Sequence, residues 1–130
     1  MMGELPMIEI SWGELFDRVT ILELKAQHCR NEADAAVIRS ELEMQRAALA
    51  PISKVDLGAL PDDLRDINAS LWAVEDALRV DEDAGRFDAD FIARARSVYK
   101  LNDQRAALKR AINDKTGAAF YEVKIYTTAP

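Results

Sequence analysis

Apolar residues along most of the chain recur every three or four positions, which is the spacing of one face of an α-helix. The first such stretch begins at Ser11-Trp12-Gly13-Glu14, which has the pattern of a helix-capping box. The spacing predicts a helix over about 12–29. Its apolar stripe consists of Trp12, Leu15, Phe16, Val19, Leu22 and Ala26. Ile21 and Leu24 lie outside this stripe, and a helix that is apolar on two faces is usually central in a fold or buried in an oligomer.

A second helix is predicted over about 32–49, with Asn31 as its N-cap and acidic residues in its first turn. Its apolar stripe is thin and consists of Ala35, Ile38, Leu42 and Leu49. One long helix that continues through residue 30 is the alternative. Pro51 ends this part of the chain, and residues 51–60 form a linker.

Two longer helices are predicted in the second half of the chain, over about 61–83 and about 89–115. Pro61 suits the first position of the former, and Asp88 and Gly117 suit the two ends of the latter. Each of these helices has an apolar seam, a row of apolar residues along one side. The seam of 61–83 has heptad spacing and consists of Leu64, Ile67, Leu71, Val74 and Leu78. The seam of 89–115 consists of Phe91, Val98, Leu101, Leu108 and Ile112. The connection around Gly85 is short, so the two helices should form an antiparallel hairpin.

The two terminal segments have strand character. Residues 7–10 are a short apolar run, and residues 120–126 alternate with aromatic and β-branched side chains. We expect the two segments to pair as a two-stranded ribbon that lies on the helices. The pattern as a whole predicts an all-α single domain over 1–130, a four-helix bundle of two helical hairpins with this ribbon added.

Composition and charge narrow the function classes. The chain has 130 residues, a formal net charge of −6, one Cys and one His. The negative charge disfavours nucleic acid as a partner, and no zinc pattern can be built from one Cys and one His. No apolar run is long enough to cross a membrane, and the N-terminus lacks the features of a signal peptide. We therefore expect a cytoplasmic protein with no membrane contact, metal or cofactor.

Charge is distributed unevenly along the predicted hairpin. Residues 75–90 hold seven acidic and two basic side chains, whereas residues 94–115 hold seven basic and two acidic ones. The plainer interpretation is a solvated dipolar surface. The more specific interpretation is that the last helix presents a basic face, which binds an anionic ligand or an acidic partner.

Polar side chains that interrupt the apolar pattern are the candidates for chemistry. Glu23 falls within the stripe of the first helix, and Arg105 falls within the seam of the last. Two further rows flank the hairpin seams: Asn68, Trp72, Glu75 and Arg79 on one helix, and Tyr99, Asn102, Lys109 and Asn113 on the other. A turn near residue 86 could bring these rows together across one groove, which Glu23 could enter. We expect Arg105 to pair with Glu23 or Glu75, because a buried charge needs a partner.

These residues allow two interpretations. A paired Arg in the seam of a small bundle can simply fix the register of the helices. Alternatively, Arg105 and Lys109 could bind a carboxylate or phosphate, with Glu75 or Glu23 as the acid–base candidate. His28 and Cys29 are not a catalytic pair, because adjacent residues on a helix point about 100° apart.

Three blocks of sequence carry a resemblance. They are IEISWGELFDRVTILELK, LPDDLRDINASLWAVEDALR and FIARARSVYKLNDQRAALKRAIND, the last followed by a Gly and EVKIY. In this order they resemble a family of short bacterial proteins with no assigned function. The resemblance implies a soluble, mostly helical protein, and it supplies no catalytic residues.

Two functions follow as expectations. The first is a non-catalytic interaction or assembly module that self-associates, with a C2 dimer favoured, and that could also bind another protein. Three features of the sequence favour it: the first helix is apolar on two faces, residues 64–78 have heptad spacing, and no strong catalytic motif is present. The alternative is a binder of, or an enzyme acting on, a small anionic metabolite held in the polar groove between the helices.

Overall fold

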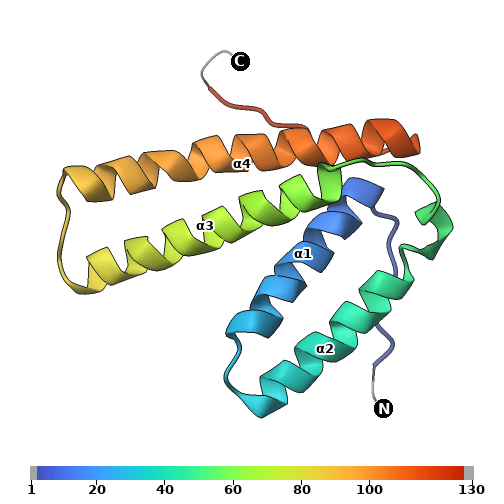
Figure 1. The fold of residues 1–130 in the computed structure, drawn as a ribbon, viewed down its shortest axis with the longest axis horizontal. Coiled ribbons are helices and arrows are strands. Elements are labelled where there is room, and N and C mark those ends of the chain that lie inside the picture. The colour runs from blue at the N-terminus through green and yellow to red at the C-terminus, as the bar shows by residue number, and fades with distance from the viewer. Residues whose placement is uncertain (1–2, 128–130) are drawn as a thin grey trace.

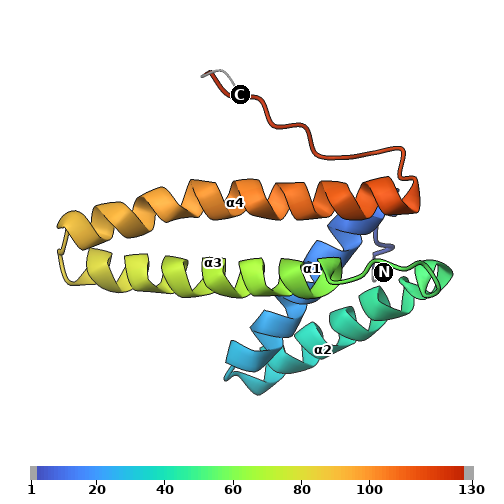
Figure 2. The same ribbon diagram turned by 45° about the horizontal axis from the view of Figure 1, so that its top comes forward.

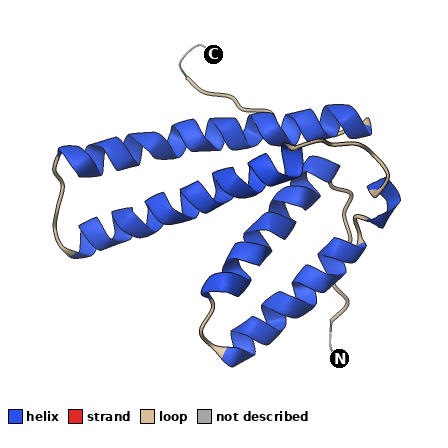
Figure 3. Cartoon of the chain, in the orientation of Figure 1, coloured by secondary structure: helices blue, strands red, loops and turns tan. Residues whose placement is uncertain are grey.

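The computed structural model describes residues 3–127, and this part of the chain is all-α (Figures 1 and 3). The helices are α1 (Trp12–His28), α2 (Glu32–Ala47), α3 (Leu60–Asp83) and α4 (Ala89–Thr116), with a short 3-10 turn, η1 (Ala50–Ile52), in the linker. The predicted fold class is confirmed, and the helix ends lie within two residues of the predicted ones. None of these helices is both long enough and apolar enough to be a candidate membrane span.

Side-chain caps explain why the helices begin where they do. The Ser11, Asn31 and Asp88 side chains accept hydrogen bonds from backbone N–H groups three residues later, at 3.0–3.1 Å. Cys29 is extended, with ψ 128°, so α1 and α2 are separate helices. Gly117 ends α4 in the left-handed conformation, φ 67°, which favours glycine.

The four helices form two antiparallel hairpins that cross at an angle. In Figure 1 the α1/α2 hairpin meets the α3/α4 hairpin where α3 begins and α4 ends. α1 packs against the other three helices, whereas α2 packs chiefly on α1. The opposite end of the α3/α4 hairpin extends beyond α1 and α2, as the turned view in Figure 2 also shows.

The apolar core is correspondingly confined to the crossing and to the α1/α2 hairpin. One cluster joins α1 to α2 through Leu15, Val19, Leu22 and Leu42. A second joins the linker, α3 and α4 through Leu57, Leu64 and Ile112. Trp12 packs against both clusters, so the start of α1 links the two hairpins.

The predicted strands and their ribbon are wrong for the described residues, none of which is in a strand. The C-terminal segment runs back along α4, away from the N-terminus (Figure 2). Its side chains find partners on α4. Lys124 Nζ lies 3.2 Å from Asp103 Oδ1, and the Arg110 guanidinium lies 3.7 Å from the centre of the Tyr121 ring. These contacts replace the expected pairing with residues 7–10.

Candidate functional site

A buried ion pair lies where the two hairpins cross. The Asp17 carboxylate, on α1, is only 1% exposed. Arg105 of α4 donates hydrogen bonds to both carboxylate oxygens. Its Nε donates to Oδ1 at 2.8 Å, and its Nη2 donates to Oδ2. Asn68 of α3 donates to Asp17 Oδ1 at 2.9 Å and to Thr20 Oγ1 at 2.7 Å. The network thus connects α1, α3 and α4. The hydrogen bonds that Arg105 donates to Asp17 raise the pKa of Arg105, although burial acts to lower it.

The prediction that Arg105 pairs with Glu23 or Glu75 is therefore wrong. Asp17 lies on a second face of α1, the one turned toward α3 and α4. That face shows in the sequence as a stripe with spacings of four, three and four residues, and its members Gly13, Asp17, Thr20 and Leu24 are all buried. The stripe is visible in the sequence as helical spacing, but its small and polar residues do not form an apolar pattern.

The start of α1 lies directly against α4. The Gly13 N–H donates to Asn113 Oδ1 at 2.7 Å, which satisfies one of the free donors at the N-terminus of α1. A Cβ atom at Gly13 would lie 2.4 Å from the Lys109 carbonyl oxygen. Asn113, a predicted groove residue, is thus committed to helix packing.

Lys109 is nearly buried, at 7% exposed, and pairs with α1. Its Nζ lies 2.7 Å from Glu14 Oε2. Burial acts to raise the pKa of Glu14, but the hydrogen bonds and charge of Lys109, with Arg18 beside it, hold that pKa below its ordinary value. Two of the cationic side chains of α4 are therefore each anchored by a carboxylate of α1.

Other predicted groove residues lie elsewhere. Glu23 binds Arg65 of α3 at 3.2 Å and Arg46 of α2 at 3.4 Å, so it does not enter a groove with Arg105. Trp72 stacks on His28, with ring centroids 4.5 Å apart, at the C-terminal end of α1.

Glu75 and Arg79 lie farther along α3, in the projecting part of the hairpin. They line a shallow groove of about 360 Å³ whose apolar members include Leu78 and Phe91. The two polar rows therefore do not face each other across one continuous groove.

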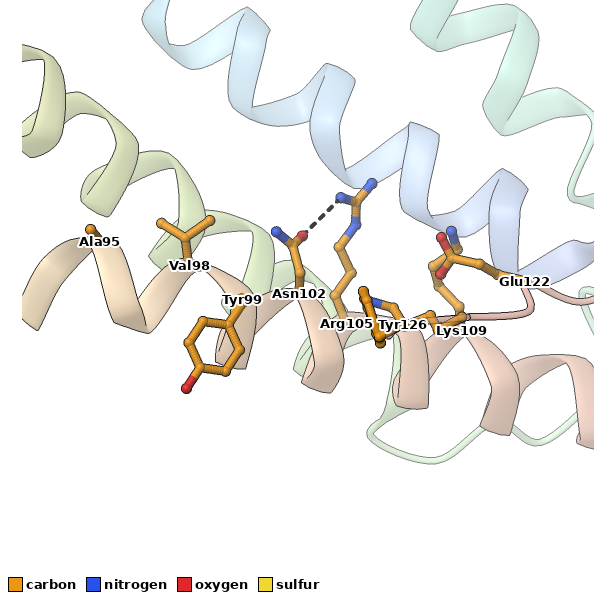
Figure 4. Close-up of a pocket in the computed structure, with 9 residues that line it drawn as sticks. Ala95, Val98, Tyr99, Asn102, Arg105, Lys109, Glu122 and Tyr126 are labelled. Carbon is orange, nitrogen blue, oxygen red and sulfur yellow. Dashed lines mark hydrogen bonds between the residues drawn. The ribbon is translucent and has the colours of Figure 1, made fainter. Parts of the chain in front are cut away.

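A different cavity gathers four of the predicted residues (Figure 4). It has a volume of about 390 Å³ and lies between α4 and the C-terminal segment. α4 contributes Tyr99, Asn102, Arg105 and Lys109, together with Ala95 and Val98. The C-terminal segment contributes Glu122, Lys124 and Tyr126. These last three were missed, although their alternation marks them as one face of an extended segment.

The described residues contain no group of three or more His, Cys, Asp or Glu side chains that could hold a metal ion. The polar groups that line the cavity are the N–H donors of Arg105, Lys109 and Lys124, the Asn102 amide, the Glu122 carboxylate, and the phenol rings of Tyr99 and Tyr126.

The chain matches a known protein family. A model described as a family of unknown function, DUF6165, matches residues 6–130. The chain belongs to this family. The match covers all four helices and the cavity, so DUF6165 includes every element described above. Comparisons with curated proteins and with solved structures find no match.

Proposed function

We propose that this DUF6165 protein is a non-catalytic assembly module that self-associates through the projecting part of its α3/α4 hairpin. One observation carries the proposal. Between Leu71 and Ile112, no apolar side chain of the hairpin is buried. Leu78, Phe91 and Val98 of the seam remain half-buried, and Ile92 is 54% exposed.

Two helices alone cannot enclose a heptad seam. An amphipathic helix is stabilised when its apolar face packs against further elements, and a second hairpin completes a four-helix bundle. Full burial of a Leu or Phe side chain contributes roughly 1.5–3 kcal/mol. Covering several such side chains can therefore outweigh a substantial part of the entropic cost of association.

The charge distribution favours a second copy of the chain as the partner. In the projecting part of the hairpin, α3 exposes acidic side chains such as Glu75, Asp76 and Glu82, whereas α4 exposes the basic side chains of Arg96 and Lys100. When two hairpins pack antiparallel about a two-fold axis, α3 of one copy can lie along α4 of the other. Oppositely charged stretches then face each other, which fixes both register and partner.

A pair of matched variants tests this proposal. Leu78→Glu places a charge in the shallow groove of the hairpin, whereas Val37→Glu makes the same type of change on α2, where Val37 is 65% exposed. By light scattering, we expect Leu78→Glu to be monomeric and Val37→Glu to remain dimeric. Circular dichroism should show both variants to be as helical as the wild type. A folded Leu78→Glu variant with the mass of the wild-type dimer would contradict this interface.

A further inference from the structure

The C-terminal segment has its amphipathic pattern reversed. Glu122, Lys124 and Tyr126 line the cavity against α4, whereas Val123 and Ile125, on the alternate positions, are 66% and 85% exposed. Apolar packing would favour the opposite orientation. Polar contacts with α4 therefore hold this segment in place, and they leave a polar cavity beneath it.

Two of the three cationic side chains that line the cavity are paired with carboxylates of α1. Arg105 is fixed by Asp17 and Lys109 by Glu14, and both carboxylates belong to α1. Such anchored side chains lose little freedom when they bind a ligand, which is the usual requirement for a preorganised site.

Both side chains also keep N–H groups to spare. Arg105 Nε and Nη2 donate to Asp17, while the partner of its Nη1 among residues 3–127 is Asn102 Oδ1, at the long distance of 3.5 Å (Figure 4). The Lys109 ammonium has three N–H groups and lies close to one carboxylate oxygen, that of Glu14. Since both residues line the cavity, these donors are available to an anion there.

The opposite wall adds selectivity. Glu122 lines the same cavity, and its negative charge is one of those that raise the pKa of Arg105. A bare anion is repelled by this carboxylate, whereas a hydroxyl group can donate a hydrogen bond to it. The volume of about 390 Å³ falls within the range of small-molecule sites.

We infer that the cavity between α4 and the C-terminal segment binds a small hydroxylated anion, with its carboxylate or phosphate group on Arg105 and Lys109 and a hydroxyl group on Glu122. The site lies within one chain and is independent of self-association.

Isothermal titration with three probes tests this inference: inorganic phosphate, glycerol 3-phosphate and citrate. We expect saturable binding, with glycerol 3-phosphate tighter than inorganic phosphate because its alcohol groups can donate to Glu122 while its phosphate group stays on Arg105 and Lys109. The comparison of citrate with glycerol 3-phosphate shows whether a carboxylate or a phosphate is preferred. No saturable binding of any probe at about 10 mM would overturn the inference, because a site that weak has a binding free energy less favourable than about −3 kcal/mol.

Four variants locate the site and separate it from the proposed dimer interface. Glu122→Gln removes the repulsion and should tighten inorganic phosphate several-fold, an effect that a purely structural role for Glu122 would not produce. Lys109→Met removes one of the two cations assigned to the anion and should weaken binding about tenfold, whereas Lys115→Met, an exposed lysine at the end of α4, should leave it unchanged. Equal losses in the two lysine variants would overturn the inference, because they would show non-specific attraction. Leu78→Glu should bind as the wild type does, which separates this site from the proposed dimer interface.

Discussion

At the scale of single residues, the decisive feature is a carboxylate that is buried together with its cation. Asp17 is 1% exposed and accepts hydrogen bonds from both Arg105 and Asn68. A buried pair of this kind contributes less to net stability than to specificity, because desolvation offsets much of the attraction. In this fold the pair connects one face of α1 to α3 and α4.

Removal of one partner should therefore be costly. Arg105→Leu leaves the Asp17 carboxylate buried without its cation, and we expect the free energy of unfolding to fall by about 3–5 kcal/mol. Chemical denaturation measures this change. Arg39→Leu, at an exposed position on α2, should alter stability by about 0.5 kcal/mol or less. An Arg105→Leu variant as stable as the wild type would show that the pair does not hold the helices together.

Gly13 provides a test of the close contact between α1 and α4. Gly13→Ala places a Cβ 2.4 Å from a backbone oxygen of Lys109, which cannot move without shifting α4. We expect a loss of about 1–3 kcal/mol of stability, even though alanine favours helix by about 1 kcal/mol. Gly3→Ala is the control and should have no effect on the denaturation midpoint, because no described atom beyond the chain neighbours lies within 4 Å of the added Cβ.

At the scale of elements, the sequence predicted the helices better than it predicted their contacts. Helix ends follow from local chemistry, such as the Ser11 and Asp88 caps and the Gly117 terminator, which a sequence displays directly. Which faces meet depends on partners far apart in the chain. Asp17 and Arg105 are 88 positions apart, and neither residue alone identifies the other. The terminal ribbon failed for the same reason, since the C-terminal segment finds its partners on α4.

The α3–α4 turn is held by a carboxylate whose titration can be followed. Hydrogen bonds from Arg94, with a smaller contribution from Arg86, lower the pKa of Asp81 below its ordinary value of 3.8. Burial acts in the opposite direction, to raise this pKa. The folded state thus binds its proton less readily than the unfolded chain. The stabilisation is fully present above about pH 4 and is lost as the pH falls through the lowered pKa.

Denaturation at a series of pH values should show this loss. The wild type should lose stability below about pH 4, and Asp81→Asn should lose less over the same range because its side chain does not titrate. Asp76→Asn, an exposed carboxylate on the same helix, is the control and should follow the wild-type profile. Parallel profiles for wild type and Asp81→Asn would show that Asp81 is not held as described.

At the scale of the whole molecule, shape is the feature that the sequence did not reveal. Heptad spacing in α3 indicates a packed seam, but it does not say that α1 and α2 cover only one end of it. The uncovered end combines half-buried apolar side chains, such as Leu78 and Phe91, with acidic α3 and basic α4 stretches. Of the predicted groove, four residues meet in a real cavity, and the others form helix contacts or line the projecting hairpin.

Sedimentation equilibrium of the wild-type protein tests self-association through the projecting hairpin most directly. Across about 1–200 µM at moderate salt, we expect the mass to approach twice 14.5 kDa, and we expect high salt to shift the equilibrium toward monomer as it screens the facing charges. A mass of one chain throughout this range would contradict self-association through the projecting hairpin.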